Sequence, residues 1–382
     1  MKNILVVGGS NGIGLAVVAE LAARGTGKIY IIDRVEPDIS LSGGSVIFKK
    51  CNLLDGDLSV LDEITDIDAL VITAGFGRVA AFEDLLDIEI SNGFKVNSIA
   101  VIRIIKHFYN KIRSKNDFQC AVLCSIAGLV SSPMFSVYAA TKAAVCRFIE
   151  SVNIELEYEG YANRILAVSP GSVQGTRFSG GSNDLLQVGS LAREIIARME
   201  SRETLFVPQI EVFGEVIERY KKDGHEYGMH SIGYKLKNGR VSSVPQVKVG
   251  YLSGTFDLFH IGHLNLLRRA KACCDYLVVG VHRDASHKGK VAFIPFEERA
   301  EIVGNIKYVD RVIPSEPEDD DVYKKEIVKY DCLFVGSDYK GTERFNRYEA
   351  YFGDKDVQII YLPYTEGTSS TQLRDCLMNS TK

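Results

Sequence analysis

Three residues in the first half of the chain, Ser125, Tyr138 and Lys142, have the types and spacing that carbonyl reduction needs. Tyr138 and Lys142 are four positions apart, so on a helix they share one face, and Ser125 follows an apolar run typical of a strand. Reduction of a ketone needs a proton for the developing alkoxide, and a free tyrosine, with a pKa of about 10, is a poor donor at neutral pH. We expect the Lys142 ammonium to stabilise the phenolate and lower that pKa.

A glycine-rich loop, GGSNGIG at 8–14, follows the first apolar run and opens the next helical stretch. Glycines there let backbone N–H groups approach a pyrophosphate at a helix N-terminus, although they also suit a tight turn and close helix packing. Asp33, 19 residues after Gly14, is placed to bind an adenosine ribose, while the neighbouring Arg34 suits a 2′-phosphate. NADH and NADPH therefore both remain open. The candidate loop residues are Gly8, Ser10, Asn11, Gly12, Ile13 and Gly14.

Two histidines in the second half, within GTFDLFHIGH at 254–263, are suited to bind phosphate. His260 and His263 are three positions apart, which places both on one helix face near its N-terminus. A structural role in the core is the first alternative and a zinc pair the second, but the spacing suggests no third ligand, and no metal is predicted. We therefore expect both imidazoles to face one phosphate chain.

The elements that must position these residues alternate between short apolar runs and amphipathic stretches of helical length, which predicts an α/β protein. We expect a doubly wound parallel sheet, of Rossmann type, followed by a second, smaller Rossmann-like domain. The 382 residues exceed the ~250 to 300 at which one core usually stops growing. The expected domains are 1–213 and 247–382, joined by a connector at 214–246. Within the connector, EVIERYKKDG could form a helix, and the later segment YKLKNGRVSS could form a hairpin through Asn238-Gly239.

Composition narrows the classes of partner. The formal net charge of −4 gives no electrostatic footprint for nucleic acid or an anionic membrane, so the expected partners are small molecules. The 8 cysteines form no Cys-x-x-Cys and are interpreted as reduced thiols. The N-terminus has only a short apolar run before its glycines, so neither secretion nor membrane insertion is expected. We expect a cytoplasmic homo-oligomer, either a dimer or a tetramer.

The motifs of the first half, over about residues 1–212, resemble the short-chain dehydrogenase/reductase family in order and spacing. The resemblance implies that Tyr138 is the general acid, that Lys142 tunes it and holds the nicotinamide ribose, that Ser125 orients the carbonyl, and that Asn97, in KVNS, supports a proton relay. The short Gly- and Ser-rich segment after the Pro-Gly pair predicts a small or open substrate pocket. The resemblance adds four cofactor-binding candidates: Ala74, Gly75, Pro170 and Gly171.

The motifs of residues 247–377 resemble the nucleotidyltransferases, and within them the glycerol-3-phosphate and choline-phosphate cytidylyltransferases. The same His-Ile-Gly-His occurs in class I aminoacyl-tRNA synthetases, but no KMSKS-like segment follows. Tyr364 stands where cytidylyltransferases have Arg, which leaves ATP as an alternative to CTP. The resemblance implies CTP with Mg²⁺, bound by Gly254, Thr255, Phe256, Asp257, Lys288, Arg299, Thr365, Ser369, Ser370 and Thr371, with Asp338 near the acceptor.

A reductase fused to a cytidylyltransferase suggests consecutive steps. We expect NAD(P)H-dependent reduction of a ketose phosphate, with ribulose 5-phosphate as lead, and then cytidylyl transfer giving a CDP-alditol such as CDP-ribitol for a capsule or teichoic-acid-like polymer. The alternatives are CDP-glycerol or CDP-tetritol synthesis, a fusion with an ATP-using adenylyltransferase, or a scaffold that senses NAD(P)H without turnover. An intact Asn97, Ser125, Tyr138 and Lys142 set argues against the sensor.

Overall fold

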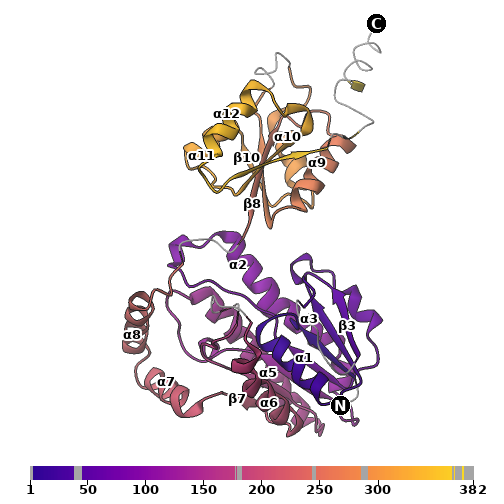
Figure 1. Cartoon of the computed structure of the whole chain (residues 1–382), viewed down its shortest axis with the longest axis vertical. Helices are drawn as coiled ribbons and strands as arrows, with labels where there is room; N and C mark the ends of the chain where they lie inside the picture. The colour runs from indigo at the N-terminus through magenta and orange to yellow at the C-terminus, as the bar shows by residue number, and fades with distance from the viewer. Residues whose placement is uncertain are drawn as a thin grey trace. The chain divides into compact units, whose positions relative to one another are not determined.

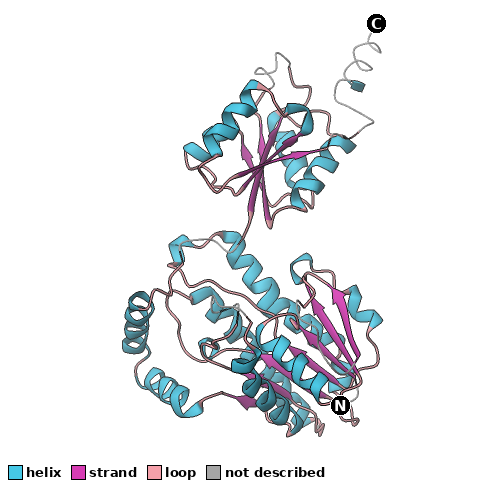
Figure 2. Ribbon diagram, viewed as in Figure 1, coloured by secondary structure: helices cyan, strands magenta, loops and turns pink. Residues whose placement is uncertain are grey.

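The computed structural model describes residues 3–37, 45–176, 178, 183–242, 247–284, 291–363, 365 and 372–373. The chain divides into two compact units, Met1–Pro245 and Gln246–Lys382. Each unit carries its own parallel sheet, so the prediction of an α/β protein with two Rossmann-like sheets is confirmed (Figures 1 and 2).

The sheet of the first unit has the order β3-β2-β1-β4-β5-β6-β7, with every pair parallel. The order reverses between β1 and β4, and ligands of doubly wound sheets bind outside the carboxyl ends of the strands at such a point. Strand β3, whose side chains are only partly buried, was not predicted from the sequence. The strands are β1 (Asn3–Val7), β2 (Lys28–Asp33), β3 (Ser45–Lys50), β4 (Ala69–Ile72), β5 (Gln119–Leu123), β6 (Ile165–Val168) and β7 (Leu205–Phe206).

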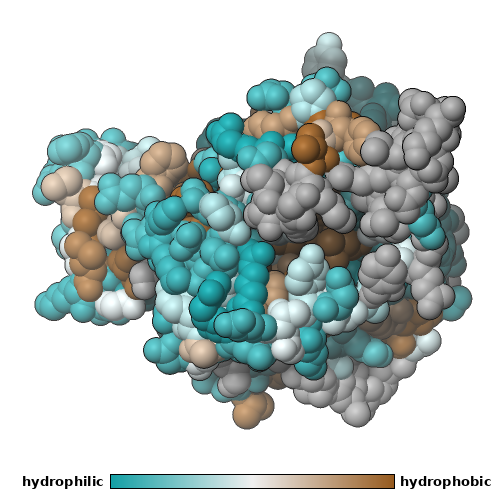
Figure 3. Space-filling model, turned by 90° about the horizontal axis from the view of Figure 1, so that it is seen from above, coloured by the Kyte–Doolittle hydropathy of each residue, from teal (hydrophilic) through white to brown (hydrophobic). Residues whose placement is uncertain are grey.

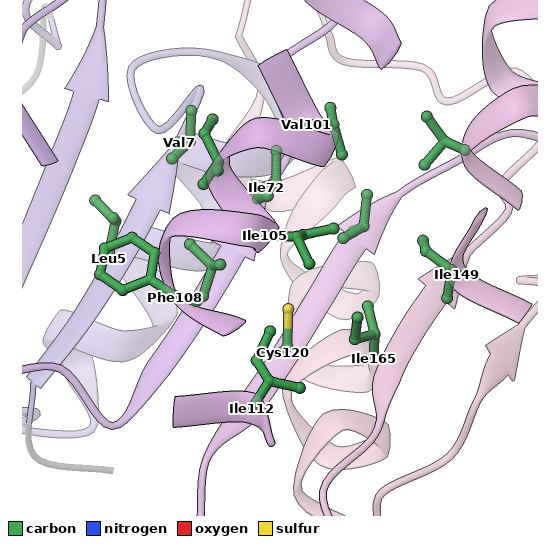
Figure 4. Close-up of a cluster of buried hydrophobic side chains, with 14 of the residues drawn as sticks. Leu5, Val7, Ile72, Val101, Ile105, Phe108, Ile112, Cys120, Ile149 and Ile165 are labelled. Atoms are coloured by element: carbon green, nitrogen blue, oxygen red, sulfur yellow. The ribbon is translucent and has the colours of Figure 1, made fainter. Parts of the chain in front are cut away.

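Helices cover both faces of this sheet because successive residues of its strands point to opposite sides. Ile4 and Val6 of β1 pack with α1 (Gly12–Ala23) and α6 (Leu185–Glu200). Leu5 and Val7 pack on the other side with α3 (Val101–His107) and α5 (Ser136–Tyr158), in the cluster drawn in Figure 4. The other helices there are α2 (Asp87–Phe94), a π-helix (Lys95–Ala100) and α4 (Tyr109–Ile112).

Two helices follow β7, where the sequence predicted a connector. They are α7 (Ile210–Lys222) and α8 (Gly224–Lys237), and the contacts described below attach them to the first unit. The helical alternative for EVIERYKKDG is therefore correct, and the hairpin through Asn238-Gly239 is not formed because α8 extends to Lys237. Gly239, with φ of 59°, is in the left-handed conformation common just beyond a helix end.

The second unit has a parallel sheet in the order β10-β9-β8-β11-β12, which reverses between β8 and β11. Its strands are β8 (Val249–Gly254), β9 (Tyr276–Val281), β10 (Arg311–Pro314), β11 (Cys332–Gly336) and β12 (Gln358–Leu362). Its helices are α9 (Ile261–Lys271), α10 (Phe296–Gly304), α11 (Asp319–Lys324) and α12 (Glu343–Phe352). Among the described residues of the whole chain, no helix is long and apolar enough to cross a membrane.

Two candidate active sites

The glycine-rich loop of the first unit connects β1 to α1 beside the reversal in strand order. Gly8 has φ of 86° and Gly12 has φ of 54°, a region of conformational space that favours glycine. A Cβ added to Gly14 would lie 2.1 Å from the carbonyl oxygen of Gly8 and 2.4 Å from Thr73 Oγ1. Glycine at these positions therefore closes the loop against β4 and brings backbone N–H groups to the start of α1.

The replacement Gly14→Ala tests this close approach. In an ordinary exposed helix the change stabilises by up to about 1 kcal/mol, but here the methyl group has no space. We expect Gly14→Ala to lower the free energy of unfolding by about 1 to 3 kcal/mol, as overpacking does, and to weaken dinucleotide binding. Urea unfolding followed by circular dichroism checks the first effect. Gly25→Ala is not a neutral control because its φ is 69°, so Gly189→Ala in α6, with only Arg193 Nη1 at 3.6 Å, is used instead.

The surroundings of this loop suit a pyrophosphate and a ribose. Ser10 Oγ is buried and has no hydrogen-bond partner among the described residues. The N–H of Gly12 donates to Asn183 Oδ1 at 2.9 Å, so a neutral hydrogen-bond acceptor lies at the first turn of α1. Asp33 Oδ2 accepts the N–H of Ser10 at 3.1 Å, which braces the loop. Arg34, exposed, donates its N–H to Asp33 Oδ1 at 2.7 Å.

The catalytic candidates of the first unit meet where β5 and α5 come together. Ser125 directly follows Cys124 after β5, and its hydroxyl hydrogen-bonds the phenol of Tyr138. Lys142 Nζ donates to the carbonyl of Leu123 at 2.8 Å and lies 5.7 Å from the centroid of the Tyr138 ring. The predicted proximity of Ser125, Tyr138 and Lys142 is therefore present.

The predicted lowering of the pKa of Tyr138 by Lys142 is not present in this structure. Burial raises the pKa of Tyr138, and the hydrogen bond from Ser125 only partly opposes it. Burial also lowers the pKa of Lys142, whose ammonium is directed to a backbone carbonyl rather than to the phenol oxygen. The phenol is thus fully protonated at neutral pH, which is the state that a proton donor requires.

Asn97 lies in the π-helix between α2 and α3 and is fully buried. Its side chain accepts the N–H of Phe76 at 3.0 Å and donates to the Phe76 carbonyl at 2.8 Å and to Thr141 Oγ1 at 3.0 Å. A Cβ at Gly75 would lie 3.1 Å from Lys142 Nζ and 3.3 Å from Asn97 Oδ1. Asn97 therefore ties the loop after β4 to α5, and a π-helix is often found at a functional site.

Two aromatic rings that were not predicted from the sequence, Phe135 and Phe178, lie against Tyr138. The Phe135 ring stacks on it at 4.2 Å between centroids, and the Phe178 ring lies 5.4 Å away. On the side of the Pro-Gly pair, a Cβ at Gly171 would lie 1.9 Å from the ring of Phe213, so α7 packs directly on this backbone. Phe135 and Phe178 therefore lie against the Tyr138 ring, and α7 packs on the Pro-Gly pair.

The second site begins at the turn between β8 and α9, whose backbone is strained. Phe256 and Leu258 have φ of 54° and 50°, which bulky residues rarely adopt outside functional sites. Asp257 between them is buried and accepts the N–H groups of Phe293 and Ile294, each at 3.0 Å. The carboxylate therefore holds the turn in its strained form. The hydroxyl of Thr255 is buried without a hydrogen-bond partner among the described residues.

The two histidines open α9 side by side, with their ring centroids 4.0 Å apart. Nδ1 of His260 accepts the N–H of Gly262 at 3.0 Å, and Nδ1 of His263 accepts the N–H of His260 at 3.4 Å. Burial lowers the pKa of His260, so its ring is neutral at pH 7. Because Nδ1 of each ring accepts a backbone N–H, the ring proton is assigned to Nε2, which makes both imidazoles hydrogen-bond donors through that atom.

Arg299, predicted to neutralise phosphate, is only 1% exposed. Its guanidinium donates to the carbonyls of Ile294 at 2.8 Å, His282 at 2.9 Å and Arg283 at 3.0 Å, and also to that of Thr255. Because these donors are spent on backbone oxygens, Arg299 joins the loops after β8 and β9 and does not present its charge to a ligand in this structure.

Asp338 and Thr365, also predicted for the second site, follow β11 and β12. Asp338 follows β11 across the strand-order reversal from the histidines, with Oδ1 close over the backbone of Gly336. Thr365 Oγ1 lies 3.3 Å from Arg269 Nη1 of α9. Lys288, Ser369, Ser370 and Thr371 lie outside the described residues.

Comparison with known families identifies both units. Residues 2–185 match the short chain dehydrogenase family, and residues 251–376 match the cytidylyltransferase-like family. The chain is therefore a bifunctional enzyme, in which a short-chain dehydrogenase/reductase is fused to a cytidylyltransferase.

Individual relatives support each half. The glycerol-3-phosphate cytidylyltransferase of Bacillus subtilis (strain 168) is 37% identical over 126 residues, which are 32% of this chain and 91% of that protein. An uncharacterized oxidoreductase of the same organism, YvrD, is 29% identical over 154 residues, which are 38% of this chain and 59% of that protein. A short chain dehydrogenase from Burkholderia cenocepacia, solved in complex with NADP, covers 60% of this chain and 97% of its own, with a TM-score of 0.51 and 20% identity. This last likeness shows the fold of the first unit.

Proposed function

We propose that the enzyme makes a CDP-alditol in two consecutive reactions. The first unit reduces a ketose phosphate with NAD(P)H, and the second transfers a cytidylyl group from CTP to the alditol phosphate and releases pyrophosphate. The observation that carries this proposal is the presence of a reductase site on the same chain as a close relative of glycerol-3-phosphate cytidylyltransferase, whose name specifies a phosphorylated polyol. Ribulose 5-phosphate is the lead substrate and CDP-ribitol the lead product.

In the reductase unit, the dinucleotide supplies the hydride. Tyr138 gives its phenol proton to the alkoxide that forms on the substrate, and Ser125, already hydrogen-bonded to this phenol, holds the carbonyl oxygen in line with it. Lys142 is buried beside them and holds a ribose hydroxyl, while the N–H groups at the start of α1 hold the pyrophosphate. The buried, unpartnered Ser10 hydroxyl is consistent with such a ligand in this cradle.

In the transferase unit, a phosphate oxygen of the alditol phosphate attacks the α-phosphorus of CTP and the bond to pyrophosphate breaks. The Nε2–H groups of His260 and His263 donate to the oxygens on which negative charge grows. Their backbone hydrogen bonds through Nδ1 fix both rings before the substrate arrives. Mg²⁺ accompanies CTP and offsets triphosphate charge.

Arg34 is proposed to set the preference between the two dinucleotides. Its side chain is exposed beside Asp33, whose carboxylate would disfavour a 2′-phosphate without a cation nearby. We expect Arg34→Ala to reduce kcat/KM for NADPH by about tenfold or more, the value of a charge-assisted hydrogen bond, and to leave NADH nearly unchanged. Steady-state kinetics with both dinucleotides measure the ratio. An unchanged NADPH/NADH ratio would assign Arg34 no contact with the 2′-phosphate.

The proposal as a whole is tested with a panel of ketose phosphates, each incubated with NADPH or NADH and CTP. We expect mass spectrometry to detect a CDP-alditol in the complete mixture, the alditol phosphate when CTP is left out, and neither product when the dinucleotide is left out. Reduction of a ketose phosphate without any nucleotide transfer to the product would contradict consecutive action.

CDP-glycerol synthesis is the second candidate, because several of the relatives that match the second unit are named glycerol-3-phosphate cytidylyltransferases. In that case dihydroxyacetone phosphate is the ketone, and its place in the panel decides between a triose and a longer sugar. The same mixture with a tetrulose phosphate tests CDP-tetritol synthesis.

A further inference from the structure

A buried lysine on α8, Lys235, belongs to neither site as predicted from the sequence. Its side chain is 9% exposed, and its ammonium donates to Ser132 Oγ at 2.8 Å and to the carbonyl of Pro133 at 2.5 Å. Burying an ammonium is costly unless an opposite charge compensates it. A buried ammonium at this position therefore needs a group that offsets the cost of its desolvation.

The segment that Lys235 contacts connects the two catalytic groups of the reductase. It lies between Ser125 and Tyr138, and it turns sharply where the N–H of Phe135 donates to the Ser132 carbonyl at 2.9 Å. The Phe135 ring then stacks on Tyr138, at 4.2 Å between centroids. The lysine is thus fixed to the segment whose Phe135 ring stacks on Tyr138.

Helices α7 and α8 contact neighbouring segments of the first unit at two separate points. Gly228 of α8 lies against Pro133, and Phe213 of α7 lies against Gly171. Other apolar side chains of α8 remain exposed, such as Met229 (60%), and Figure 3 shows apolar residues among polar ones on the lobe at the left, where Figure 1 places these helices. Helices α7 and α8 therefore pack on the Pro133 segment, which leads to Tyr138, and on the Pro-Gly pair.

No carboxylate forms an ion pair with Lys235 among the described residues, and the charged group that acts on it is a second cation, Arg240. Burial, and then Arg240, lower the pKa of Lys235 to about 8, so the ammonium remains charged at pH 7. In the same unit, the buried guanidinium of Arg78 is paired with the Glu89 carboxylate at 2.7 Å, whereas Lys235 has no such acidic partner among the described residues. A buried ammonium with no acid paired to it among the described residues is suited to bind an anion.

We propose that Lys235 binds the phosphate group of the reductase substrate and so selects phosphorylated ketoses over free ones. This inference rests on the proposed function and names the group that recognises its substrate class. An ammonium has three donors, of which Ser132 and Pro133 take two, and the Ser132 hydroxyl retains a proton to donate. A phosphate monoester has the acceptor oxygens and the charge that match both groups, while the far end of the substrate places its ketone at Tyr138.

The test compares kcat/KM for the best ketose phosphate of the panel with kcat/KM for the same sugar without phosphate. We expect Lys235→Met, which keeps the length of the side chain, to lower the phosphate preference about 10- to 100-fold, the effect of one charge-assisted hydrogen bond. The rate with the free ketose should not change. Lys237→Met is the matched control, since Lys237 is exposed on the same helix. Inorganic phosphate should inhibit the wild type competitively and Lys235→Met much more weakly.

Three outcomes separate the possible failures. A wild-type enzyme without any phosphate preference contradicts the proposed function itself. A wild-type preference that survives unchanged in Lys235→Met overturns the role of Lys235 alone, because a lysine that merely fastens α8 would affect both sugars equally. Dinucleotide binding, followed by fluorescence, reports whether the variant is folded. If Lys235→Met does not fold, Lys235→Arg and Ser132→Ala are measured instead. We expect the preference for the phosphorylated sugar to be retained in Lys235→Arg and reduced in Ser132→Ala.

Discussion

Tyr138→Phe should abolish most ketone reduction and leave cytidylyl transfer intact. The substitution keeps the ring, which stacks on Phe135 and lies 5.4 Å from the tilted ring of Phe178, and removes only the hydroxyl that Ser125 contacts. General acid catalysis contributes about 10² to 10⁴ in rate, so we expect a loss of that size in kcat for reduction. Binding of the dinucleotide should change little, since its expected contacts lie on Lys142 and on the glycine-rich loop.

The direction of the pKa shift adds a second expectation for the wild type. Burial raises the pKa of Tyr138, so the phenol remains protonated well above neutral pH. Reduction should therefore not decline as the pH rises from 7 to 9 through loss of this proton. The opposite result would be a wild-type rate that falls between pH 7 and 9 and a Tyr138→Phe rate that does not. It would show that bound substrates lower the pKa of Tyr138, the effect that the sequence predicted for Lys142.

Two assays are made on the same enzyme preparation. Oxidation of NAD(P)H measures ketone reduction, and formation of CDP-alditol from added alditol phosphate measures cytidylyl transfer. Tyr158→Phe is the matched control, because Tyr158 ends the same helix and is 93% exposed. Equal loss of both activities in folded Tyr138→Phe would contradict two independent sites. Full retention of reduction would remove Tyr138 from the chemistry.

The sequence predicted those features whose signal is local. Buried parallel strands are continuous apolar runs, so most strands of the first sheet, and β8 and β9 of the second, could be located from runs such as ALVI of β4. The pair Tyr138 and Lys142 could be placed on one helix face by counting residues, and Ser125 could be placed near them because it ends a neighbouring strand. Strand β3 gave no such signal, since it runs along the sheet edge with no fully buried side chain.

The sequence could not predict contacts made by elements with weak patterns. Helix α8 contains Gly228 and Gly233 and ends at Asn238-Gly239, which is equally typical of a hairpin turn. Only packing on the Pro133 segment distinguishes the two structures, and it is this packing that buries Lys235. The orientation of Arg299 could not be predicted for a similar reason. An arginine within a phosphate-binding motif suggests contact with a ligand, and nothing in the sequence shows that its N–H groups donate to the backbone carbonyls of four loop residues.

The second large effect is expected from His260→Ala and from His263→Ala. Each variant removes one of two prepositioned Nε2–H donors, and loss of one such donor commonly costs about 2.7 to 4 kcal/mol of transition-state stabilisation. CDP-alditol formation should therefore fall about 10²- to 10³-fold in kcat. The affinity for CTP should fall much less, because these hydrogen bonds strengthen only as charge grows at the α-phosphorus.

The two variants should differ in a way that the structure specifies. His263 Nδ1 accepts the N–H of His260, and His260 Nδ1 accepts that of Gly262, so each ring also satisfies a backbone donor at the start of α9. The shorter of these bonds, at 3.0 Å against 3.4 Å, belongs to His260. Loss of this cap typically costs about 0.5 to 2 kcal/mol, so His260→Ala should show the larger drop in the stability of the second unit.

Steady-state kinetics, calorimetric titration with CTP, and NAD(P)H oxidation on the same preparation separate these effects. Because the reductase site belongs to the other unit, its activity should be unchanged in both variants, and CTP titration shows whether the second unit remains folded. His260→Asn offers a matched variant, since an asparagine oxygen can still cap α9 while its amide cannot reach as far as Nε2. It should recover stability without recovering turnover. Normal turnover in His260→Ala and His263→Ala would make both histidines structural and would require another source of charge stabilisation at the α-phosphorus.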